Sequence, residues 1–548
     1  MKQDIEALKQ AFRAGRHTEA IAECEALCVQ EPAHFEVKRL CAMMHALVGN
    51  YARSLELLQQ VRKQSPEDAD VLFNIGTCQR ELRDFKGAAD SFKTYTEKFS
   101  GHADGWASLA ESKFHLNEFK EGVALADRAI KLDSRSVPAW TVRGNCQKSM
   151  RLFNDALASF TQAIQLAPDV AELRIHRGDT CDIVGDLKQA AADYTAALAL
   201  TPNDSQTLEK ATHCLLQLGR GKEGIRLCRE ILKLHPDNLT AKLGAEWLLS
   251  KLVPVWHLSM MNEEDRNRPY YEGLKSVVTP DKVVFEIGTG SGLLAMMAAK
   301  LGAQKVFTCE AVSVVADTAS KIIERNNFQD RIKVLAKPSY AVQLQKDLPE
   351  RADILVHEIF SSELLGEHVL PAIEDAKARL LKPGGEILPS SASIMIALVG
   401  GDELGKELHV GEAFGFDLRL FNAIHPKKRP IHREDLPRVL LTDDTEAFRF
   451  DFCKASTFPA EKKRLELTAV QSGLCYGVIQ WIRFELGAGI VFENHPAKRR
   501  PVANWQHTIY CFDEPLHLEE GSVVTVNAMH DRSRPWFDLA IDGQGAKP

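Results

Sequence analysis

A period of 34 residues constrains the first half of this chain more than any other feature. A turn position recurs at this spacing and is occupied by Pro32, Pro66, Ser100, Ser134, Pro168, Pro202 and Pro236. Ten residues after most of these turns comes a small residue, namely Ala42, Gly76, Ala110, Gly144 or Gly178. Small residues at a fixed phase let two helices pack closely, and one such pair cannot bury its apolar face alone. The period therefore predicts stacked antiparallel helix pairs over about residues 3–238.

This pattern resembles the tetratricopeptide (TPR) family, with six full repeats and one degenerate leading repeat. The resemblance implies an α-solenoid over residues 1–238 whose concave face receives a peptide or protein ligand. The alternative is a rigid spacer that binds nothing. Residues 239–280 are expected to form a capping helix, over Leu239–Leu252, followed by a polar and aromatic lid or linker segment.

Composition excludes several classes of protein. Hydrophobic residues make up 45% and charged residues 26% of the 548 positions, with a net charge of only -7, which is typical of an ordinary globular protein and not of a dedicated nucleic-acid binder. No apolar stretch approaches membrane length, and the N-terminus lacks an apolar signal core. The 12 cysteines are scattered without a CxxC pair, which favours free thiols over disulfides or a metal site. We therefore expect a cytoplasmic protein without metal, nucleic-acid or membrane partners.

The period changes in the second half of the chain. Val283–Ile287 and Lys305–Cys309 have the pattern of buried strands, and Leu293–Leu301 has the pattern of an amphipathic helix between them. A glycine loop follows the first strand, and Glu310 ends the second. Strand, glycine turn, helix, strand and terminal acid predict a Rossmann-like sheet over residues 281–392.

The glycine loop indicates which nucleotide this sheet binds. Gly288, Gly290 and Gly292 form G-x-G-x-G, whereas the dinucleotide fingerprint is G-x-G-x-x-G. The Lys-Ser/Thr pair of a P-loop is missing after the loop. Glu310 is placed to accept hydrogen bonds from two ribose hydroxyls. A ligand with a ribose and no phosphate fits, and we predict S-adenosylmethionine.

Acidic residues gather after another predicted strand, Ile354–Val356. Glu358, Glu363 and Glu367 follow it within a few positions. Carboxylates crowded at the mouth of a buried sheet are costly unless a cation lies between them. We interpret Glu358 and Glu367 as a clamp for a guanidinium group. The alternative is that they are solvated loop acids.

After Pro389 the chain shows short strand-like runs separated by turns. They occupy Ser393–Val399, Phe448–Phe452, Arg464–Thr468, Val478–Leu486, Thr508–Phe512 and Val523–Ala528. This pattern predicts a β-barrel-like domain over residues 393–548. The whole chain is thus expected to combine an α-solenoid, an α/β sheet and a β domain.

Residues 255–548 resemble the protein arginine methyltransferase family. The resemblance rests on the donor loop Val284–Leu294, the two glutamates nine residues apart, the lid segment Met260–Arg266, and Ala503-Asn504-Trp505. It implies that Glu358 and Glu367 are catalytic. It further implies donor contacts from Met260, Arg266, Glu286, Gly288, Gly290, Gly292, Glu310 and Ser339, and substrate contacts from Ser362, Asn504 and Trp505.

The resemblance also implies protein substrates with exposed arginine and a homodimer formed through an arm at Gly411–Glu434. Two departures affect the substrate site, because Asn504 replaces the family's histidine and Ser362 replaces a common aromatic residue. A third is that the acid usual near the adenine is missing around Ser339 and Ala341. Two alternatives therefore stay open: a methyltransferase acting on another acceptor, and a TPR adaptor with an inactive methyltransferase domain.

Overall fold

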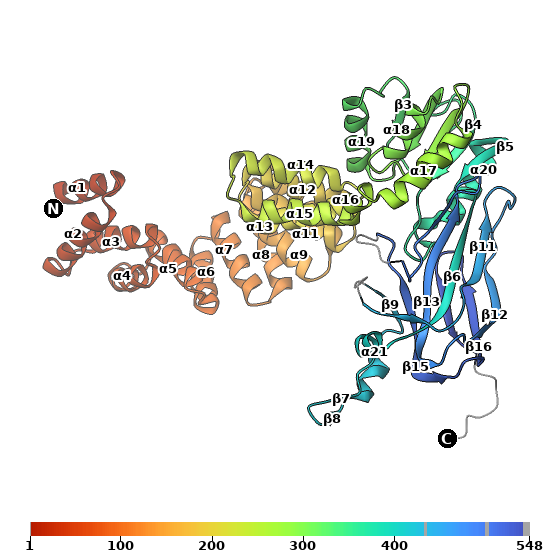
Figure 1. Ribbon diagram of the computed structural model, residues 1–548. Helices are drawn as coiled ribbons and strands as arrows, with labels where there is room; N and C mark the ends of the chain where they lie inside the picture. The colour runs from red at the N-terminus through yellow and green to blue at the C-terminus, as the bar shows by residue number, and fades with distance from the viewer. Residues whose placement is uncertain (1, 432–435, 499–503, 541–548) are drawn as a thin grey trace. The chain divides into compact units, whose positions relative to one another are not determined.

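The repeated segment folds into paired antiparallel helices, as the period predicts (Figure 1). The computed structural model describes residues 2–431, 436–498 and 504–540, and the chain divides into two units, Met1–Leu249 and Ser250–Pro548. The helices of the first unit are α1 (Lys2–Arg13), α2 (His17–Gln30), α3 (Phe35–Leu47), α4 (Tyr51–Gln64), α5 (Ala69–Glu81), α6 (Phe85–Lys98), α7 (Ala103–His115), α8 (Phe119–Leu132), α9 (Val137–Ser149), α10 (Phe153–Leu166), α11 (Ala171–Ile183), α12 (Leu187–Leu200), α13 (Ser205–Gln217), α14 (Gly221–Leu234) and α15 (Leu239–Leu252). The expected capping helix is α15.

The small residues lie where the two helices of a pair touch. A Cβ added to Gly144 in α9 would lie 2.6 Å from the ring of Phe160 in α10. The same change at Gly76 in α5 would place a Cβ 2.9 Å from Phe92 in α6. Both phenylalanines are completely buried. Glycine is therefore required at this phase by the close approach of the partner helix's aromatic ring.

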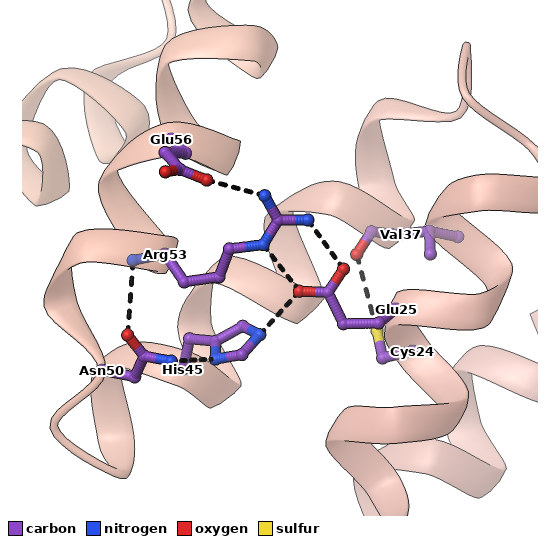
Figure 2. A network of polar contacts seen from close by, with 7 residues as sticks. All are labelled: Cys24, Glu25, Val37, His45, Asn50, Arg53 and Glu56. Carbon is purple, nitrogen blue, oxygen red and sulfur yellow. Dashed lines mark hydrogen bonds and ion pairs between the residues drawn. The ribbon is translucent and has the colours of Figure 1, made fainter.

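A polar network joins α2 and α3 to α4, and Figure 2 shows it at close range. Arg53 donates from Nε and Nη2 to the two carboxylate oxygens of Glu25, each at 2.8 Å, and from Nη1 to Glu56 at 2.7 Å. His45 Nε2 lies 2.9 Å from the same Glu25. Hydrogen bonding to Arg53 lowers the pKa of Glu25 to about 2. The degenerate leading repeat is thus attached to the first full repeat by ionic as well as apolar contacts.

The second unit contains the predicted parallel sheet, with strand order β3-β2-β1-β4-β5. Its strands are β1 (Val283–Ile287), β2 (Lys305–Cys309), β3 (Ile332–Leu335), β4 (Ala352–His357) and β5 (Leu381–Leu388), and the helices of this part are α16 (Trp256–Met261), α17 (Glu264–Val277), α18 (Leu293–Lys300), α19 (Ser313–Arg325) and α20 (Val369–Arg379). Ile287 at the end of β1 pairs in register with Cys309 of β2 and His357 of β4. The loops after all three strands therefore emerge at one edge, where ligands bind in open α/β sheets.

The remaining strands form the predicted antiparallel β domain. The larger sheet has the order β10-β6-β13-β15-β9, with β11 on β6 and β14 on β13, and the smaller has the order β12-β16-β17. Their bounds are β6 (Ser391–Gly400), β9 (Lys428–Pro430), β10 (Val439–Leu440), β11 (Thr445–Asp451), β12 (Glu461–Thr468), β13 (Gly473–Glu485), β14 (Val491–Glu493), β15 (Thr508–Leu518), β16 (Val523–His530) and β17 (Pro535–Leu539). One apolar core runs from the parallel sheet into this domain, from Tyr270 to Phe537. The two parts are therefore packed as one body.

The structure differs from the sequence-based expectations in two places. The segment 254–280 was expected to be a polar lid, but Tyr270 and Leu274 in α17 are fully buried in the core. After Pro389 the sequence shows only strand-like runs, yet α21 (Asp402–Leu408) forms a short helix. Among the described residues, no helix combines the length and apolarity needed to cross a membrane.

Candidate active site

A cavity of about 940 Å³ opens at the edge of the parallel sheet where β1, β2 and β4 end. It lies within the second unit. Nine of the sequence-predicted site residues line it, namely Met260, Arg266, Glu286, Gly288, Gly290, Glu310, Ser339, Glu358 and Glu367. Residues that lie more than a hundred positions apart are thus brought to one place, which the sequence could suggest only by analogy.

The glycine loop follows β1 and adopts left-handed backbone conformations. The φ angles are 86° at Gly288, 51° at Gly290 and 84° at Gly292, a region that glycine enters without a steric penalty. Gly288 and Gly290 line the cavity. Gly292 does not line it, because this residue caps the N-terminus of α18, where a Cβ would lie 3.1 Å from Ile323.

Glu310 is fixed at the end of β2 by the backbone of the loops around it. Its carboxylate accepts from the N–H of Val312 at 2.9 Å and from the N–H of Gly290 at 3.2 Å. The glycine loop and the acid are therefore held in one arrangement. A carboxylate has further lone pairs for two hydroxyl donors, so Glu310 can still accept hydrogen bonds from a ribose.

Glu286 at the end of β1 is a buried acid without compensation. Its side chain is 1% exposed, and neither carboxylate oxygen has a well-formed hydrogen bond among the described residues. Burial raises the pKa of Glu286 to about 8, and the Thr308 hydroxyl opposes this rise. A buried carboxylate of this kind favours a cation beside it. The cavity thus fits a positively charged ligand such as S-adenosylmethionine, which carries an ammonium and a sulfonium.

Glu358 directly follows β4 and is paired with a guanidinium group from the protein itself. Arg266 Nη2 donates to Glu358 Oε2 at 2.5 Å, and both side chains are buried. A second guanidinium nitrogen, Nη1, donates to the carbonyl of Met260 at 3.0 Å. Burial raises the pKa of Glu358 to about 7, although Arg266 opposes this rise. The site therefore already accommodates a flat cation against Glu358.

Glu367 faces the same cavity from the loop that precedes α20. Burial raises its pKa, His257 opposes the rise, and the charge of Glu367 in turn raises the pKa of Glu358. Its φ of 58° is left-handed, which is uncommon for a residue with a side chain and costs conformational energy. The loop holds this strain because Ser361 Oγ accepts from the N–H of Gly366 at 3.0 Å. Glu367 is itself exposed, so one buried and one exposed carboxylate side chain line the same cavity.

The third acid of the loop lies outside this pair. Glu363 accepts from Lys428 Nζ at 2.5 Å and does not line the cavity. Lys428, the first residue of β9, neutralises the charge of Glu363, and the two residues form a structural ion pair. The interpretation of solvated loop acids therefore does not fit Glu358, whose side chain is 6% exposed and paired with Arg266. Glu367 is exposed but lines the cavity, and Glu363 is partly exposed.

The three predicted substrate residues lie beside the cavity and do not line it. Asn504 Nδ2 donates to Glu263 at 2.6 Å, and its carbonyl oxygen accepts from Ser259 of α16. Trp505 is buried and donates from Nε1 to the carbonyl of Phe360 at 2.9 Å. Ser362 Oγ accepts from the N–H of Gln506 at 3.0 Å. Residues 504–506 thus tie the end of α16 and the start of α17 to the loop that carries Glu358 and Glu367. Ala503 lies outside the described residues.

Sequence reasoning missed two residues of this neighbourhood. His257 lines the cavity and acts electrostatically on Glu367. Glu263 is buried and receives the Asn504 hydrogen bond. The sequence contains one indication of a role for Glu263: it precedes Arg266 by three residues, so both side chains lie on the same face at the start of a helix.

A possible set of metal ligands occurs in the first unit. Among the described residues, Glu25, Cys41 and His45 bring ligand atoms within 4.8 Å of one another. Glu25 is already neutralised by Arg53 and contacted by His45 Nε2, as Figure 2 shows. The prediction of no metal remains a prediction.

Comparison with known proteins agrees with this geometry. An arginine N(omega)-methyltransferase from Streptomyces achromogenes subsp. streptozoticus is 33% identical over 298 residues, which is 54% of this chain and 82% of that one. The chain belongs to the arginine N-methyltransferase family. The family membership confirms the predicted enzyme class, and with the Glu286 and Glu310 geometry it supports S-adenosylmethionine as the donor.

Two other proteins are similar to this arginine methyltransferase over about half of the chain. Protein arginine N-methyltransferase 7 of Danio rerio is 31% identical over 315 residues, covering 53% of this chain and 46% of that protein. The chain therefore spans about half the length of this relative. A chain of the Trypanosoma brucei PRMT1 enzyme-prozyme heterotetrameric complex with AdoHcy is 22% identical, with a TM-score of 0.44, and covers 53% of this chain and 93% of that chain.

Family models match separate parts of the arginine methyltransferase. The model described as ribosomal protein L11 methyltransferase (PrmA) matches residues 271–392. The tetratricopeptide repeat model matches residues 48–103 and 148–205. The array predicted from the 34-residue period is thereby confirmed as a TPR array.

Proposed function

We propose that this enzyme transfers a methyl group from S-adenosylmethionine to a side-chain nitrogen of arginine in protein substrates. The observation that carries the proposal is that two acids with raised pKa values, Glu358 and Glu367, line the cavity that also contains Glu286 and Glu310. The first of these acids already bonds a guanidinium, that of Arg266. A cavity with a cation clamp on one side and a ribose acceptor on the other suits this reaction.

The two glutamates supply the chemistry that arginine lacks. Arginine is a poor nucleophile because its charge is delocalised and its pKa lies above 12. Carboxylates that accept from its outer N–H groups draw the positive charge toward those nitrogens. The remaining nitrogen then keeps more electron density for attack. Fixing the reacting groups in line contributes on the order of several kcal/mol.

The bound donor would supply the electrophilic methyl group, and Glu310, Glu286 and Arg266 would hold its ribose, its cationic centre and its carboxylate. The acceptor nitrogen loses one proton in the reaction. With pKa values raised by burial, Glu358 and Glu367 are better proton acceptors than ordinary carboxylates. Asn504 stands where the family has histidine and has no basic nitrogen, so we assign the proton to one of these glutamates.

Protein-bound arginine is favoured as the acceptor by the TPR array, because arrays of this kind present extended surfaces to protein partners. The array supplies no residue of the cavity, since every cavity residue belongs to the second unit. A second candidate acceptor is free arginine, which the similarity to the Streptomyces arginine N(omega)-methyltransferase favours.

The test is to compare the chain and its Glu367→Gln variant with radiolabelled S-adenosylmethionine and two acceptors, an unfractionated protein mixture and free arginine. We expect methylarginine in hydrolysed protein, and we expect Glu367→Gln to lower turnover by about 10²–10⁴-fold while donor affinity stays unchanged. Glu363→Gln is the matched control, because Glu363 belongs to the same loop but pairs with Lys428.

Label only on free arginine would favour the second candidate. Label on other residues, or no label at all, would favour one of the two alternatives raised by the sequence. A Glu367→Gln protein that methylates at the rate of the parent would refute the clamp.

The arm predicted from the resemblance carries exposed apolar side chains that suit a second copy of this chain. From the end of β7 (Glu412–Ala413) through the turn Arg419–Ile424, the exposed apolar side chains are Phe414, Phe416, Leu418, Leu420, Phe421 and Ile424. Apolar surface gathered in this way indicates a protein contact. We propose a homodimer formed through this arm; residues 432–434 of the predicted range lie outside the described residues. The cytoplasmic location and the lack of a nucleic-acid partner remain predictions.

A further inference from the structure

A second cavity, of about 490 Å³, lies on the TPR array itself. Its walls come from α11, α13 and α15, the first helices of successive pairs, and every lining residue belongs to the first unit. Leu243 and Trp247 of α15 line it and are 60% and 36% exposed. An indole and an isobutyl group left partly in water at the wall of a cavity offer apolar surface to a ligand.

The ring of Trp247 is held in place from one side. His213 of α13 stacks on it, with ring centres 6.3 Å apart and planes inclined by 21°. His213 in turn contacts Gln217 at 2.6 Å. A tryptophan face fixed at a cavity wall is the arrangement that attracts a cation above the ring.

The charge of this cavity is negative. Lys210 lines it, but its ammonium is neutralised by Asp179 at 2.7 Å. Asp182 and Glu209 also line it and are exposed, and neither forms an ion pair with another described residue. The cavity therefore presents two uncompensated carboxylates next to an aromatic and an aliphatic side chain.

We propose that this cavity is a docking site for a basic segment of a partner protein, one that carries arginine beside an apolar residue. The guanidinium is planar and both stacks on aromatic faces and bonds carboxylates, so Trp247, Asp182 and Glu209 match its two modes of contact. The apolar neighbour packs on Leu243. We further infer that the docked partner is the protein whose arginine is methylated, and this step rests on the proposed function.

The binding test uses the full chain carrying the Glu367→Gln substitution in every protein compared. This substitution weakens binding of the probe's arginine at the active site, so that the second cavity dominates the signal. The probe is a fluorescein-labelled peptide of repeated Arg-Gly-Phe units, followed by fluorescence anisotropy. We expect Trp247→Ala and Glu209→Lys each to weaken binding about five- to tenfold, and higher salt to weaken binding to the parent. The matched control is Glu97→Lys, the same charge reversal at an exposed acid of α6 outside the cavity.

Equal affinity of the probe for all these proteins would overturn the proposal. A preference for the same peptide with glutamate in place of arginine would overturn it as well. Because Glu209 is exposed, reversing its charge leaves the fold intact. Glu209→Lys therefore tests the site even if Trp247→Ala disturbs the end of α15.

A kinetic test on the active chain separates docking from chemistry. Acceptors are a short peptide with one arginine and a longer one that adds a distant Arg-Gly-Phe segment. We expect Glu209→Lys to raise KM about five- to tenfold for the long acceptor only, with kcat unchanged. An equal KM change for both acceptors would overturn the docking site. Methylation of neither acceptor would refute the proposed function, while the anisotropy result would still decide docking.

Discussion

The individual residues that define the active site are buried acids with raised pKa values. Glu286 is 1% exposed and the side chain of Glu358 is 6% exposed, and burial raises their pKa values to about 8 and about 7. Each one is stable as a charged group only with a cation beside it. Arg266 serves Glu358, and no described residue serves Glu286 in this way. The ligand-free site is therefore poised for cationic ligands.

These pKa values predict a pH dependence. The clamp must be deprotonated to hold a guanidinium, and arginine stays charged throughout this range. Because burial raises the pKa of Glu358 to about 7, we expect kcat/KM to fall as the pH drops below about 7. The measurement is kcat/KM against pH with saturating donor.

The control is Glu363→Gln, which removes an acid that pairs with Lys428 and does not line the cavity. We expect this variant to show the same dependence of kcat/KM on pH as the parent. A rate that stays constant from about pH 5 to about pH 8 would be inconsistent with a clamp titrating near neutrality.

At the scale of secondary-structure elements, the spacing between paired helices is set by small residues opposite large ones. Gly144 in α9 faces the ring of Phe160 in α10, which is completely buried and has no room to move. Protein interiors are packed closely enough that one added methyl group is felt. The repeat array is therefore sensitive to added side-chain volume at this position of the repeat.

We expect Gly144→Ala to lower the free energy of unfolding of the first unit by about 1–3 kcal/mol, through overpacking. This happens even though alanine is the better helix former by about 1 kcal/mol. The measurement is denaturant unfolding followed by circular dichroism. The control is Gly101→Ala, where the added Cβ meets no atom within 4 Å. Equal stability of the two variants would show that α9 and α10 are not held at this distance.

At the scale of the whole molecule, the arm joins the catalytic unit to a proposed second copy. Its side chains at Leu420 and Phe421 are 92% and 61% exposed. Side chains of this kind are costly to leave in water unless a partner covers them. The assembled enzyme is therefore expected to be larger than one chain.

We expect the chain to sediment as a dimer and the double variant Leu420→Asp, Phe421→Asp to sediment as a monomer, because charge opposes burial of this surface. Analytical ultracentrifugation measures both. Val523→Asp on β16 is the control, since it places the same charge at another exposed apolar residue. A double variant that remains dimeric would place the contact elsewhere.

Several particular features of fold and site could be predicted because their signals are local. The strand Val283–Ile287 and the strand Lys305–Cys309 have the predicted bounds, since a run of apolar residues between turns is read directly from the chain. The burial of Tyr270 was missed because α17 is rich in charged residues and only its packing against the β domain covers the ring. The bridge from Asn504 to Glu263 was missed because 241 positions separate its two ends.

By itself, the sequence determined the repeat phase of the TPR array, the order of strands and helices around the glycine loop, and the presence of Glu358 and Glu367. These features depend on periodicity and on neighbours along the chain. The tertiary structure alone decided that these two acids share a cavity with Glu286, that Glu363 is neutralised by Lys428, and that Asp182 and Glu209 share a cavity with Trp247. The physical reason is that burial and charge pairing depend on which distant elements pack together, and that is fixed only when the sheet register and the helix stack have formed.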